Sequence, residues 1–416
     1  MAGGSETVVK KILVSELRAG MHIHEFCGSW MDHPFWRAKF TVSTEEELKR
    51  IASCGVKEIW IDTSKGEDLA TGVTRAQVTR EVERELESFA AEPSEIIVEG
   101  PLGEAAIAKA ASLYKRSVPR ITALFAEARM GKAVDARGCV TLVDEISESV
   151  LRNPGALISV ARLKRRDEYT YMHSVAVCAL MVALGRQLKL NAEELRQAGL
   201  AGMLHDLGKA FTPLEVLNKP GKLSEAEFEI MKGHPERGHA VLVEGGTAGP
   251  EVLDVCLHHH EKVDGSGYPH HLPDAEISLF AKMGAVCDVY DAITSVRPYK
   301  PGWDPGEALR RMAQWKGHFD EHIFQAFVKS VGIYPVGTLV RLKSGRIAVV
   351  TSQKAKSMLA PKVKVFFSTK ANMRIPPEEI DLSASWCKDE IACCESRDDW
   401  HFKDVEQLWG GVHVGR

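Results

Sequence analysis

The chain has 416 residues, of which 44% are hydrophobic and 26% are charged, and its formal net charge is −4. This length suggests two or three domains, and the near-neutral charge balance argues against a protein that coats DNA. No stretch approaches the roughly 18 apolar residues of a membrane span, and the first residues lack the apolar core of a signal peptide. Nine scattered cysteines without a CxxC pair favour a cytoplasmic protein with reduced thiols.

Residues 1–75 are predicted to form a small α/β domain. Two short β-like runs, at 10–17 and 57–63, flank a segment with the pattern of a helix. That helix is expected to begin at Ser43 or Thr44, since both residue types accept a hydrogen bond from the first helical turn. The domain is a candidate for regulation or for pairing two protomers.

Residues 76–130 are predicted to form a helical linker, and residues 131–332 a helical domain without convincing strands. Within that domain, Asn191 and Glu194 have the spacing of a capping box. Gly208 is expected to end the helix that this box begins.

Residues 333–416 show a different pattern. Apolar and polar residues alternate around Ser344 and Gly345, which predicts a β-hairpin, and residues 363–367 could add a third strand. The end of the chain is an acidic tail. The predicted fold class is therefore mainly α, with smaller β-containing parts at either end.

The stretch HDLGK, residues 205–209, is the first that indicates a metal-binding or catalytic site. It places His205 and Asp206 side by side at a helix end, where the two oxygens of the carboxylate could bridge two cations and the imidazole suits iron, manganese or zinc. Lys209 follows one turn later and could contact a phosphate oxygen. Such a dipeptide occurs by chance, so its weight comes from the histidine-rich helices around it.

Those helices supply further candidates. His173 lies in a strongly apolar helix, where a lone histidine would more often be a core residue. Asp288 and Asp291 are three residues apart and share a helix face, and a carboxylate in so apolar a helix is costly unless it is paired or binds a metal. The stretch HHHEKVDGSGYP, residues 258–269, joins three histidines to a glycine-rich turn.

The set YTYMHS, HDLGK, a downstream histidine, HHEKVDGSGYP and DVYDAITSVRPYK resembles the HD-GYP domain. This domain is a subgroup of the HD phosphohydrolases, and its members hydrolyse the bacterial messenger cyclic di-GMP. The match covers about 160–332. The N-terminal segment resembles the uncharacterised domain often fused ahead of it, and YPVGTLVRL resembles a β extension often found after it. The resemblance implies an all-helical HD-domain core at 131–332, a small α/β N-terminal domain and a short β-rich C-terminal extension.

The resemblance also implies residue roles. The positions that match metal ligands are His173, His205, Asp206, His234, His259, His260 and Asp288. The positions that match substrate-binding residues are Lys209, Gly267, Tyr268, Pro269, Arg297 and Lys300. Asp206 would bridge two metals, Lys209 would contact the scissile phosphate, and His258 is the extra histidine that is not a ligand.

The expected number of metal ions follows from one difference between this chain and some members of the family. Some members of the family carry a glutamate four residues before the first histidine ligand, where it helps to hold a third metal, and this chain has Tyr169 there. The adjacent Glu168 points elsewhere on a helix. We therefore expect two divalent metal ions, with iron or manganese favoured.

The implied reaction is attack of a metal-bridging hydroxide on the phosphodiester of cyclic di-GMP, with Asp206 and Lys209 as catalytic residues. The product would be pGpG, and a second cut would give GMP. One alternative is an HD phosphohydrolase of another nucleotide, such as a dNTP or ppGpp. Another is a receptor or adaptor that binds cyclic di-GMP or diguanylate cyclase proteins and turns over little. Neither DNA binding nor membrane insertion is expected, and homodimerisation is a further expectation.

Overall fold

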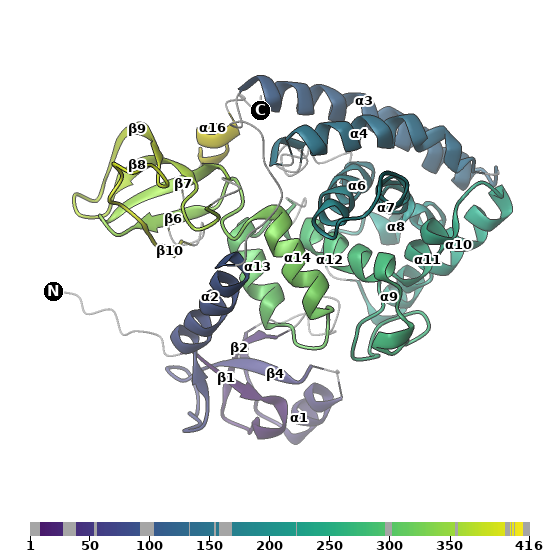
Figure 1. The fold of residues 1–416 in the computed structure, drawn as a ribbon. Coiled ribbons are helices and arrows are strands. Elements are labelled where there is room, and N and C mark those ends of the chain that lie inside the picture. Colours follow the sequence, from purple (N-terminus) through teal and green to yellow (C-terminus); the bar gives the residue numbers. More distant parts are fainter. Residues whose placement is uncertain are drawn as a thin grey trace. The chain divides into compact units, whose positions relative to one another are not determined.

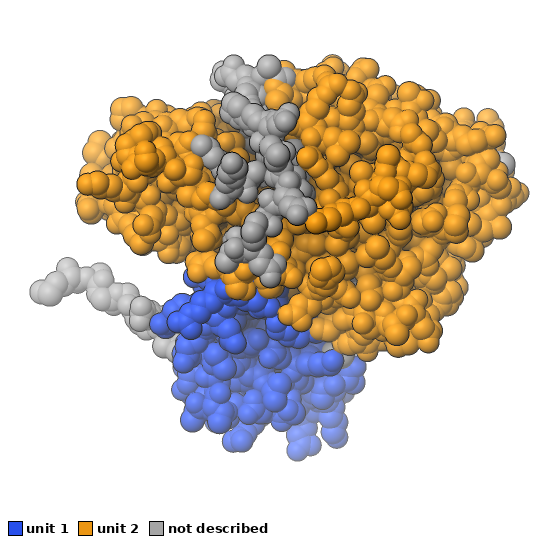
Figure 2. All heavy atoms as spheres, in the orientation of Figure 1, with its two compact units in different colours: residues 1–85, 222–226, 313–316 blue, residues 86–221, 227–312, 317–416 orange. Residues whose placement is uncertain are grey.

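The computed structural model describes residues 9–27, 39–53, 56–91, 104–132, 134–153, 155–157, 169–221, 223–295, 302–353, 357–395, 400, 402 and 404–410. The chain divides into two compact units, which Figure 2 shows in different colours. Unit 1 comprises residues 1–85, 222–226 and 313–316, and unit 2 comprises residues 86–221, 227–312 and 317–416.

Unit 1 is built on a five-stranded antiparallel sheet with the strand order β3-β2-β4-β1-β5. Strands β1, β2 and β4 of this sheet are labelled in Figure 1. Its elements are β1 (Val9–Leu13), the 3-10 helix η1 (Val14–Glu16), β2 (His22–Phe26), β3 (Phe40–Thr41), α1 (Glu45–Ala52), β4 (Glu58–Asp62), β5 (Val73–Thr74) and the start of α2 (Arg75–Ala91). Ile23, Ile51 and Ile61 are fully buried in its core. Thr44 is the N-cap of α1, because its side chain accepts from the amide of Glu47.

Unit 2 is mostly helical (Figure 1). Its helices are α3 (Glu104–Arg129), η2 (Ala136–Cys139), α4 (Val140–Arg152), α6 (Tyr169–Gln187), α7 (Ala192–Leu204), η4 (Leu207–Phe211), α8 (Leu214–Leu217), α9 (Glu225–Lys232), α10 (His234–Gly245), α11 (Pro250–His258), η5 (Asp274–Glu276), α12 (Leu279–Thr294), α13 (Pro305–Gln314) and α14 (Glu321–Val331). Every residue of α6 from 172 to 185 is buried, which is the pattern of a central helix. This helix packs against α7 and α12.

The start of α7 confirms the predicted capping box, since Asn191 Oδ1 accepts from the amide of Glu194 and the Glu194 carboxylate accepts from the amide of Asn191. The prediction that Gly208 ends this helix is wrong. Helix α7 ends at Leu204, and Gly208 lies inside the 3-10 helix η4. A Cβ atom at Gly208 would lie 1.8 Å from the carbonyl oxygen of His234, so this position needs a glycine because η4 and α10 approach closely.

The C-terminal part of unit 2 is a second antiparallel sheet with the order β10-β6-β7-β8-β9. Its elements are β6 (Leu339–Leu342), β7 (Arg346–Ser352), β8 (Lys362–Ser368), β9 (Met373–Asp381), β10 (Ile391–Cys394) and the helix α16 (Val405–Gly410). The β6–β7 pair confirms the predicted hairpin, in which Gly345 has a φ of 82°. Strand β8 confirms the third strand.

The mainly helical fold class with two small sheets is thereby confirmed. None of the helices in the described part of the chain combines the length and apolarity that crossing a bilayer requires.

Candidate metal centre

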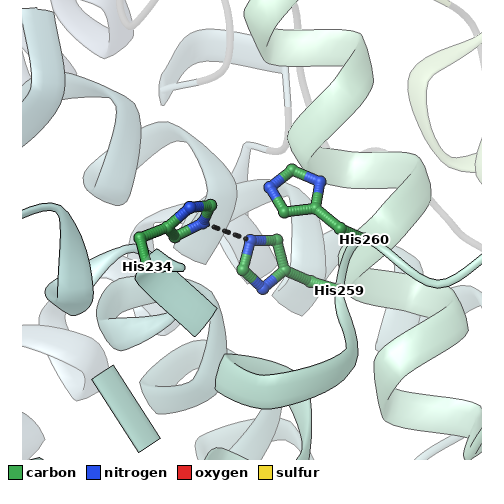
Figure 3. Close-up of side chains that lie close together, drawn as sticks. All are labelled: His234, His259 and His260. Carbon is green, nitrogen blue, oxygen red and sulfur yellow. Dashed lines mark hydrogen bonds between the residues drawn. The ribbon is translucent and has the colours of Figure 1, made fainter. Parts of the chain in front are cut away.

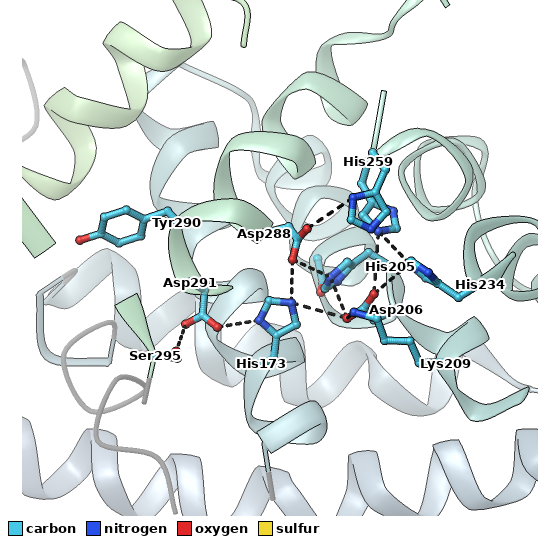
Figure 4. A network of polar contacts seen from close by, with 12 residues as sticks. His173, His205, Asp206, Lys209, His234, His259, Asp288, Tyr290, Asp291 and Ser295 are labelled. Atoms are coloured by element: carbon cyan, nitrogen blue, oxygen red, sulfur yellow. Dashed lines mark hydrogen bonds and ion pairs between the residues drawn. The ribbon is translucent and has the colours of Figure 1, made fainter. Parts of the chain in front are cut away.

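All the residues predicted as metal ligands come together in unit 2, and Figure 4 labels all of them except His260, which Figure 3 labels. They lie on or beside different helices, and none exposes more than 8% of its surface. Their places are His173 on α6, His205 and Asp206 between α7 and η4, His234 at the start of α10, His259 and His260 directly after α11, and Asp288 on α12. The structure thus gathers donor atoms that are spread over much of the chain.

The donors form two groups, each with its ligand atoms within 4.8 Å of one another. The first group consists of His173, His205 and Asp206, and the second of His234, His259 and His260. Figure 3 shows the second group, in which Nε2 of His234 lies 3.3 Å from Nε2 of His259.

Asp206 belongs to the first group, and its two oxygens face the histidines of both groups (Figure 4). Its Oδ2 is 3.5 Å from Nε2 of His173 and 3.4 Å from Nε2 of His205. Its Oδ1 is 3.2 Å from Nε2 of His234 and 3.8 Å from Nε2 of His259. This is the placement that a carboxylate bridging two cations requires.

Asp288 contacts both groups from α12. Its Oδ1 lies 2.8 Å from Nε2 of His173 and 3.8 Å from Nε2 of His205. Its Oδ2 lies 3.8 Å from Nδ1 of His260. A second carboxylate therefore faces the space that the imidazoles surround.

Helix ends orient several of the imidazoles. Each of three histidines directs its Nδ1 to a backbone carbonyl three or four residues earlier, at distances of 2.8 to 2.9 Å. The pairs are His205 with Gly202, His234 with Met231, and His259 with Val255. Carbonyls near the end of a helix can accept this bond because most of them lack a helical partner, and the carbonyl of Val255 accepts it in addition to the amide of His259. A proton held on Nδ1 leaves the lone pair of Nε2 facing the site.

The donor set fits divalent metal ions. Nε2 of His205 is buried and makes no hydrogen bond among the described residues, although Oδ2 of Asp206 lies 3.4 Å away. A buried polar atom without a partner is costly, and a cation would satisfy it. Imidazole and carboxylate ligands together suit iron, manganese and zinc.

The carboxylates are held in their charged form. Burial opposes ionisation of Asp206, but the neighbouring His205 and Lys209 outweigh it and hold the pKa of this carboxyl well below its usual range. Asp288 shows the same balance, since hydrogen bonding to His173 outweighs burial and its pKa is also well below the usual value. Both side chains are therefore anionic donors at neutral pH.

Most of the imidazoles are held neutral. Burial lowers the pKa of His259 to about 3, and it also lowers the pKa of His234 and of His260. The pKa of His173 is raised instead, because hydrogen bonds to two carboxylates outweigh its burial. Neutral imidazole is the form that binds a metal.

Lys209 lies at the edge of the cluster. Its Nζ is 2.5 Å from Oδ2 of Asp206, and its side chain is 21% exposed. An ammonium group in this position can reach both the buried carboxylate and an anion that enters from solvent.

The segment 262–273, here called the GYP loop, covers one side of the second group. The ring of Tyr268 stacks on His260 with a centroid distance of 4.7 Å and an interplanar angle of 22°. Gly267 packs so tightly that a Cβ atom there would lie 2.4 Å from Cα of Glu261. Pro269 follows in the same loop, so the predicted substrate-side residues are next to the ligand cluster.

His258 is turned to other partners. Its Nδ1 lies 2.7 Å from Oδ1 of Asp254, and its Nε2 lies 3.0 Å from Nδ1 of His270. Of the three consecutive histidines, only His259 and His260 therefore belong to the candidate centre.

Some predicted residues cannot be placed. Arg297 and Lys300 lie outside the described residues, as does Glu168. The backbone of Tyr169 begins α6.

Asp291 is not among the predicted ligands, although its three-residue spacing from Asp288 places both carboxylates on one helix face. Oδ2 of Asp291 lies 2.6 Å from Nδ1 of His173, and its Oδ1 accepts a hydrogen bond of 3.3 Å from the hydroxyl of Ser295. Asp291 thus holds the outer nitrogen of a candidate ligand.

Two family models match parts of this chain. Residues 155–323 match the family model described as HD domain, and residues 9–139 match the one described as a domain of unknown function, DUF3391. The chain is 50% identical to "Cyclic di-GMP phosphodiesterase PA4108" of Pseudomonas aeruginosa over 408 residues. These residues make up 97% of this chain and 96% of that protein.

Other relatives match less than half of this chain. "Cyclic di-GMP phosphodiesterase response regulator RpfG" of Xanthomonas campestris is 38% identical over 41% of this chain and 47% of that protein. "3'3'-cGAMP-specific phosphodiesterase 1" of Vibrio cholerae is 34% identical over 42% of this chain and 41% of that protein. The solved structure of Bd1817, titled a HDG"Y"P protein from Bdellovibrio bacteriovorus, gives a TM-score of 0.45 at 17% identity, over 77% of this chain and 98% of that chain.

The Pseudomonas relative is similar over nearly the full length of both chains. The two domain matches follow one another in the order that the sequence resemblance implies. The chain therefore belongs to the HD-GYP family of HD-domain proteins, in the form that carries a domain of unknown function ahead of the HD domain.

Proposed function

We propose that this protein is a metal-dependent phosphodiesterase that hydrolyses cyclic di-GMP to pGpG, with a further cut to GMP. The observation that carries the proposal is the position of Asp206, which offers one carboxylate oxygen to each of two groups of buried histidines. The name of the full-length Pseudomonas relative supports the choice of substrate.

Two divalent metal ions would be held by the two ligand groups, with Asp206 shared between them and Asp288 as an additional donor. The donor types support iron or manganese. When bound, such ions lower the pKa of a coordinated water and polarise the phosphoryl oxygens.

The other residues would act on the substrate. Lys209 would donate a hydrogen bond to a non-bridging phosphate oxygen, where its charge is worth more in a partly buried site than in water. Tyr268, fixed against His260, would form a wall beside the scissile phosphate. The buried surroundings of Asp206 would limit the entry of bulk water around the reacting group.

The test is anaerobic purification of the full chain, metal analysis, and separation of the nucleotide products after incubation with cyclic di-GMP. We expect the appearance of pGpG in proportion to the loaded metal. Absence of turnover in protein fully loaded with iron or manganese would contradict the enzymatic proposal. Binding of cyclic di-GMP without turnover in the same sample would instead support the receptor alternative.

A second candidate substrate is a different cyclic dinucleotide. Relatives over less than half of this chain are named 3'3'-cGAMP-specific phosphodiesterases, which makes 3'3'-cGAMP the second candidate. A panel of cyclic di-GMP, 3'3'-cGAMP, a dNTP and ppGpp at equal metal loading measures the preference. A larger kcat/KM for 3'3'-cGAMP would favour this second candidate.

The expected diguanylate cyclase partners, homodimerisation and cytoplasmic location stay predictions. Co-purification with diguanylate cyclase domain proteins and the mass of the protein in solution would test the first two.

A further inference from the structure

We propose that Glu261 is a positioning residue that fixes the GYP loop for substrate binding and does not hold a metal. This role rests on the proposed function and deepens it, because it identifies a residue that fixes Tyr268 and the GYP loop beside the substrate. Glu261 directly follows His259 and His260, so its place in the sequence would equally suit a third ligand from the same segment.

The contacts of Glu261 point away from the ligand groups. Its side chain is buried, with 2% exposure, and it belongs to neither group of candidate ligands. Oε1 accepts a hydrogen bond of 2.7 Å from the amide of His270, and Oε2 accepts one of 3.1 Å from the amide of Leu272. Both carboxyl oxygens thus accept hydrogen bonds from the part of the GYP loop that follows Tyr268.

Other contacts hold the part of the GYP loop that precedes Tyr268. The amide of Asp264 donates to the carbonyl of Gly317 at 3.0 Å, and the amide of Gly265 donates to the carbonyl of Lys262 at 2.9 Å. Asp264 also forms an isolated bridge with Pro273 across the loop. The residues that follow Tyr268 are anchored instead by the two hydrogen bonds to the carboxyl group of Glu261.

The consequence is the orientation of Tyr268. Its amide donates to the carbonyl of His260 at 3.2 Å, and two residues later the amide of His270 donates to Glu261. The backbone is therefore fixed on both sides of the ring that stacks on His260. Because this ring would form the wall beside the substrate, loosening its backbone should weaken binding of a large substrate more than it changes the chemistry.

The experiment compares Glu261→Gln with wild type as full-length, metal-loaded protein on two substrates. Cyclic di-GMP needs the wall of the loop, whereas bis(4-nitrophenyl) phosphate is a small phosphodiester that reports on the metal centre. An amide side chain keeps one acceptor but presents an N–H group to the other backbone donor, so one anchor is lost. Glu276→Gln is the matched control, since it makes the same change at an exposed carboxyl just beyond the loop.

For Glu261→Gln we expect unchanged metal content, an unchanged rate on bis(4-nitrophenyl) phosphate, and a KM for cyclic di-GMP raised by roughly tenfold. Hydrogen exchange should rise at the amides of His270 and Leu272 and stay unchanged in α12. In a Tyr268→Ala background the Glu261→Gln change should raise KM little further, because both act through the same ring.

Loss of metal from Glu261→Gln would overturn the proposal, because it would place the carboxylate in the metal shell. An equal loss of rate on both substrates, or full additivity with Tyr268→Ala, would also overturn it. If Glu261→Gln does not fold, the milder Glu261→Asp variant carries the same test, since its shorter side chain cannot reach both amides. Failure of wild type to cleave cyclic di-GMP while it cleaves bis(4-nitrophenyl) phosphate would contradict the proposed function instead.

Discussion

Oδ2 of Asp291 lies 2.6 Å from Nδ1 of His173, while Oδ1 of Asp288 lies 2.8 Å from Nε2 on the other side of the same ring. One carboxylate of α12 thus holds the outer nitrogen of the imidazole and the other faces its inner nitrogen. The three-residue spacing of the two aspartates puts both on one face of the helix. An outer carboxylate of this kind fixes the tautomer of a ligand and raises its basicity.

The first prediction concerns this outer carboxylate. Asp291→Asn should weaken metal binding by about 10- to 100-fold, because the amide can no longer hold the Nδ1 proton as a charged acceptor does. The measurement is competition for the metal with a chelator of known affinity. Asp144→Asn, at an exposed carboxyl that pairs with Arg196, is the control and should leave the affinity unchanged. Equal affinity in Asp291→Asn and wild type would show that the contact has no role in the centre.

The second prediction concerns the shared carboxylate. Asp206→Ala should abolish metal loading and turnover together, since its two oxygens face both ligand groups. The metal content per chain and the rate on cyclic di-GMP should be measured on the same preparation. A variant that keeps wild-type turnover would rule out the bridging role.

The third prediction separates substrate contact from metal binding. Lys209→Met should retain both metals but reduce kcat by about 100- to 1000-fold, as removal of a single donor to a transition-state oxygen commonly does. Lys219→Met is the control, because Nζ of Lys219 pairs with Glu227 instead. If Lys209→Met loses metal as well as rate, the lysine acts mainly by keeping Asp206 in place.

The fourth prediction concerns the packing of η4 against α10. Gly208→Ala should destabilise the protein by about 1–3 kcal/mol or more, since the added Cβ would overlap the carbonyl of His234 and the amide of Gly238. Thermal unfolding should show the loss, and the metal content should fall because His234 moves. Gly138→Ala is a matched control in another 3-10 helix, where a Cβ meets no atom within 4 Å. Equal unfolding temperatures for the two variants would refute the close approach.

Gly208 also shows where sequence reasoning fails. A glycine after an apolar helical run can end the helix or can permit another backbone to approach, and periodicity does not distinguish the two. The capping box at Asn191 was predictable because all its partners lie within one turn. The hairpin at Gly345 was predictable for the same reason, since its turn and strands are adjacent in the chain.

The strands β9 and β10 were not predicted, and the reasons are physical. Strand β9 contains Pro376 and Pro377 and is mostly exposed, which is tolerated because it lies at the edge of its sheet. Strand β10 is short and pairs with β6, which lies far earlier in the chain.

The candidate centre depended on contacts over long sequence separations. His173 and Asp288 are 115 residues apart, and no local pattern joins them. The resemblance to a known family supplied the ligand set, while the roles of Asp291 and Glu261 required coordinates because both act through other groups.

The last prediction is that the metal-free protein becomes less stable as the pH falls from 7 to 5. The folded pKa of His259 is about 3, whereas a histidine in an unfolded chain titrates near 6.5. Between these values the unfolded chain binds a proton that the folded chain does not, so the contribution to stability is present above about 6.5 and is lost as the pH falls. His234 and His260 have pKa shifts in the same direction.

His173 works against this trend, because its raised pKa contributes stability below its unfolded value that is lost as the pH rises through the folded pKa. Asp206 and Asp288 contribute little change in this window, since their lowered pKa values matter only below about 4. We expect the three lowered histidine pKa values to outweigh the raised one. Thermal unfolding of chelator-treated protein at pH 7 and pH 5 measures the net effect, and a midpoint that rises on acidification would show that the imidazoles are not held neutral in the folded state.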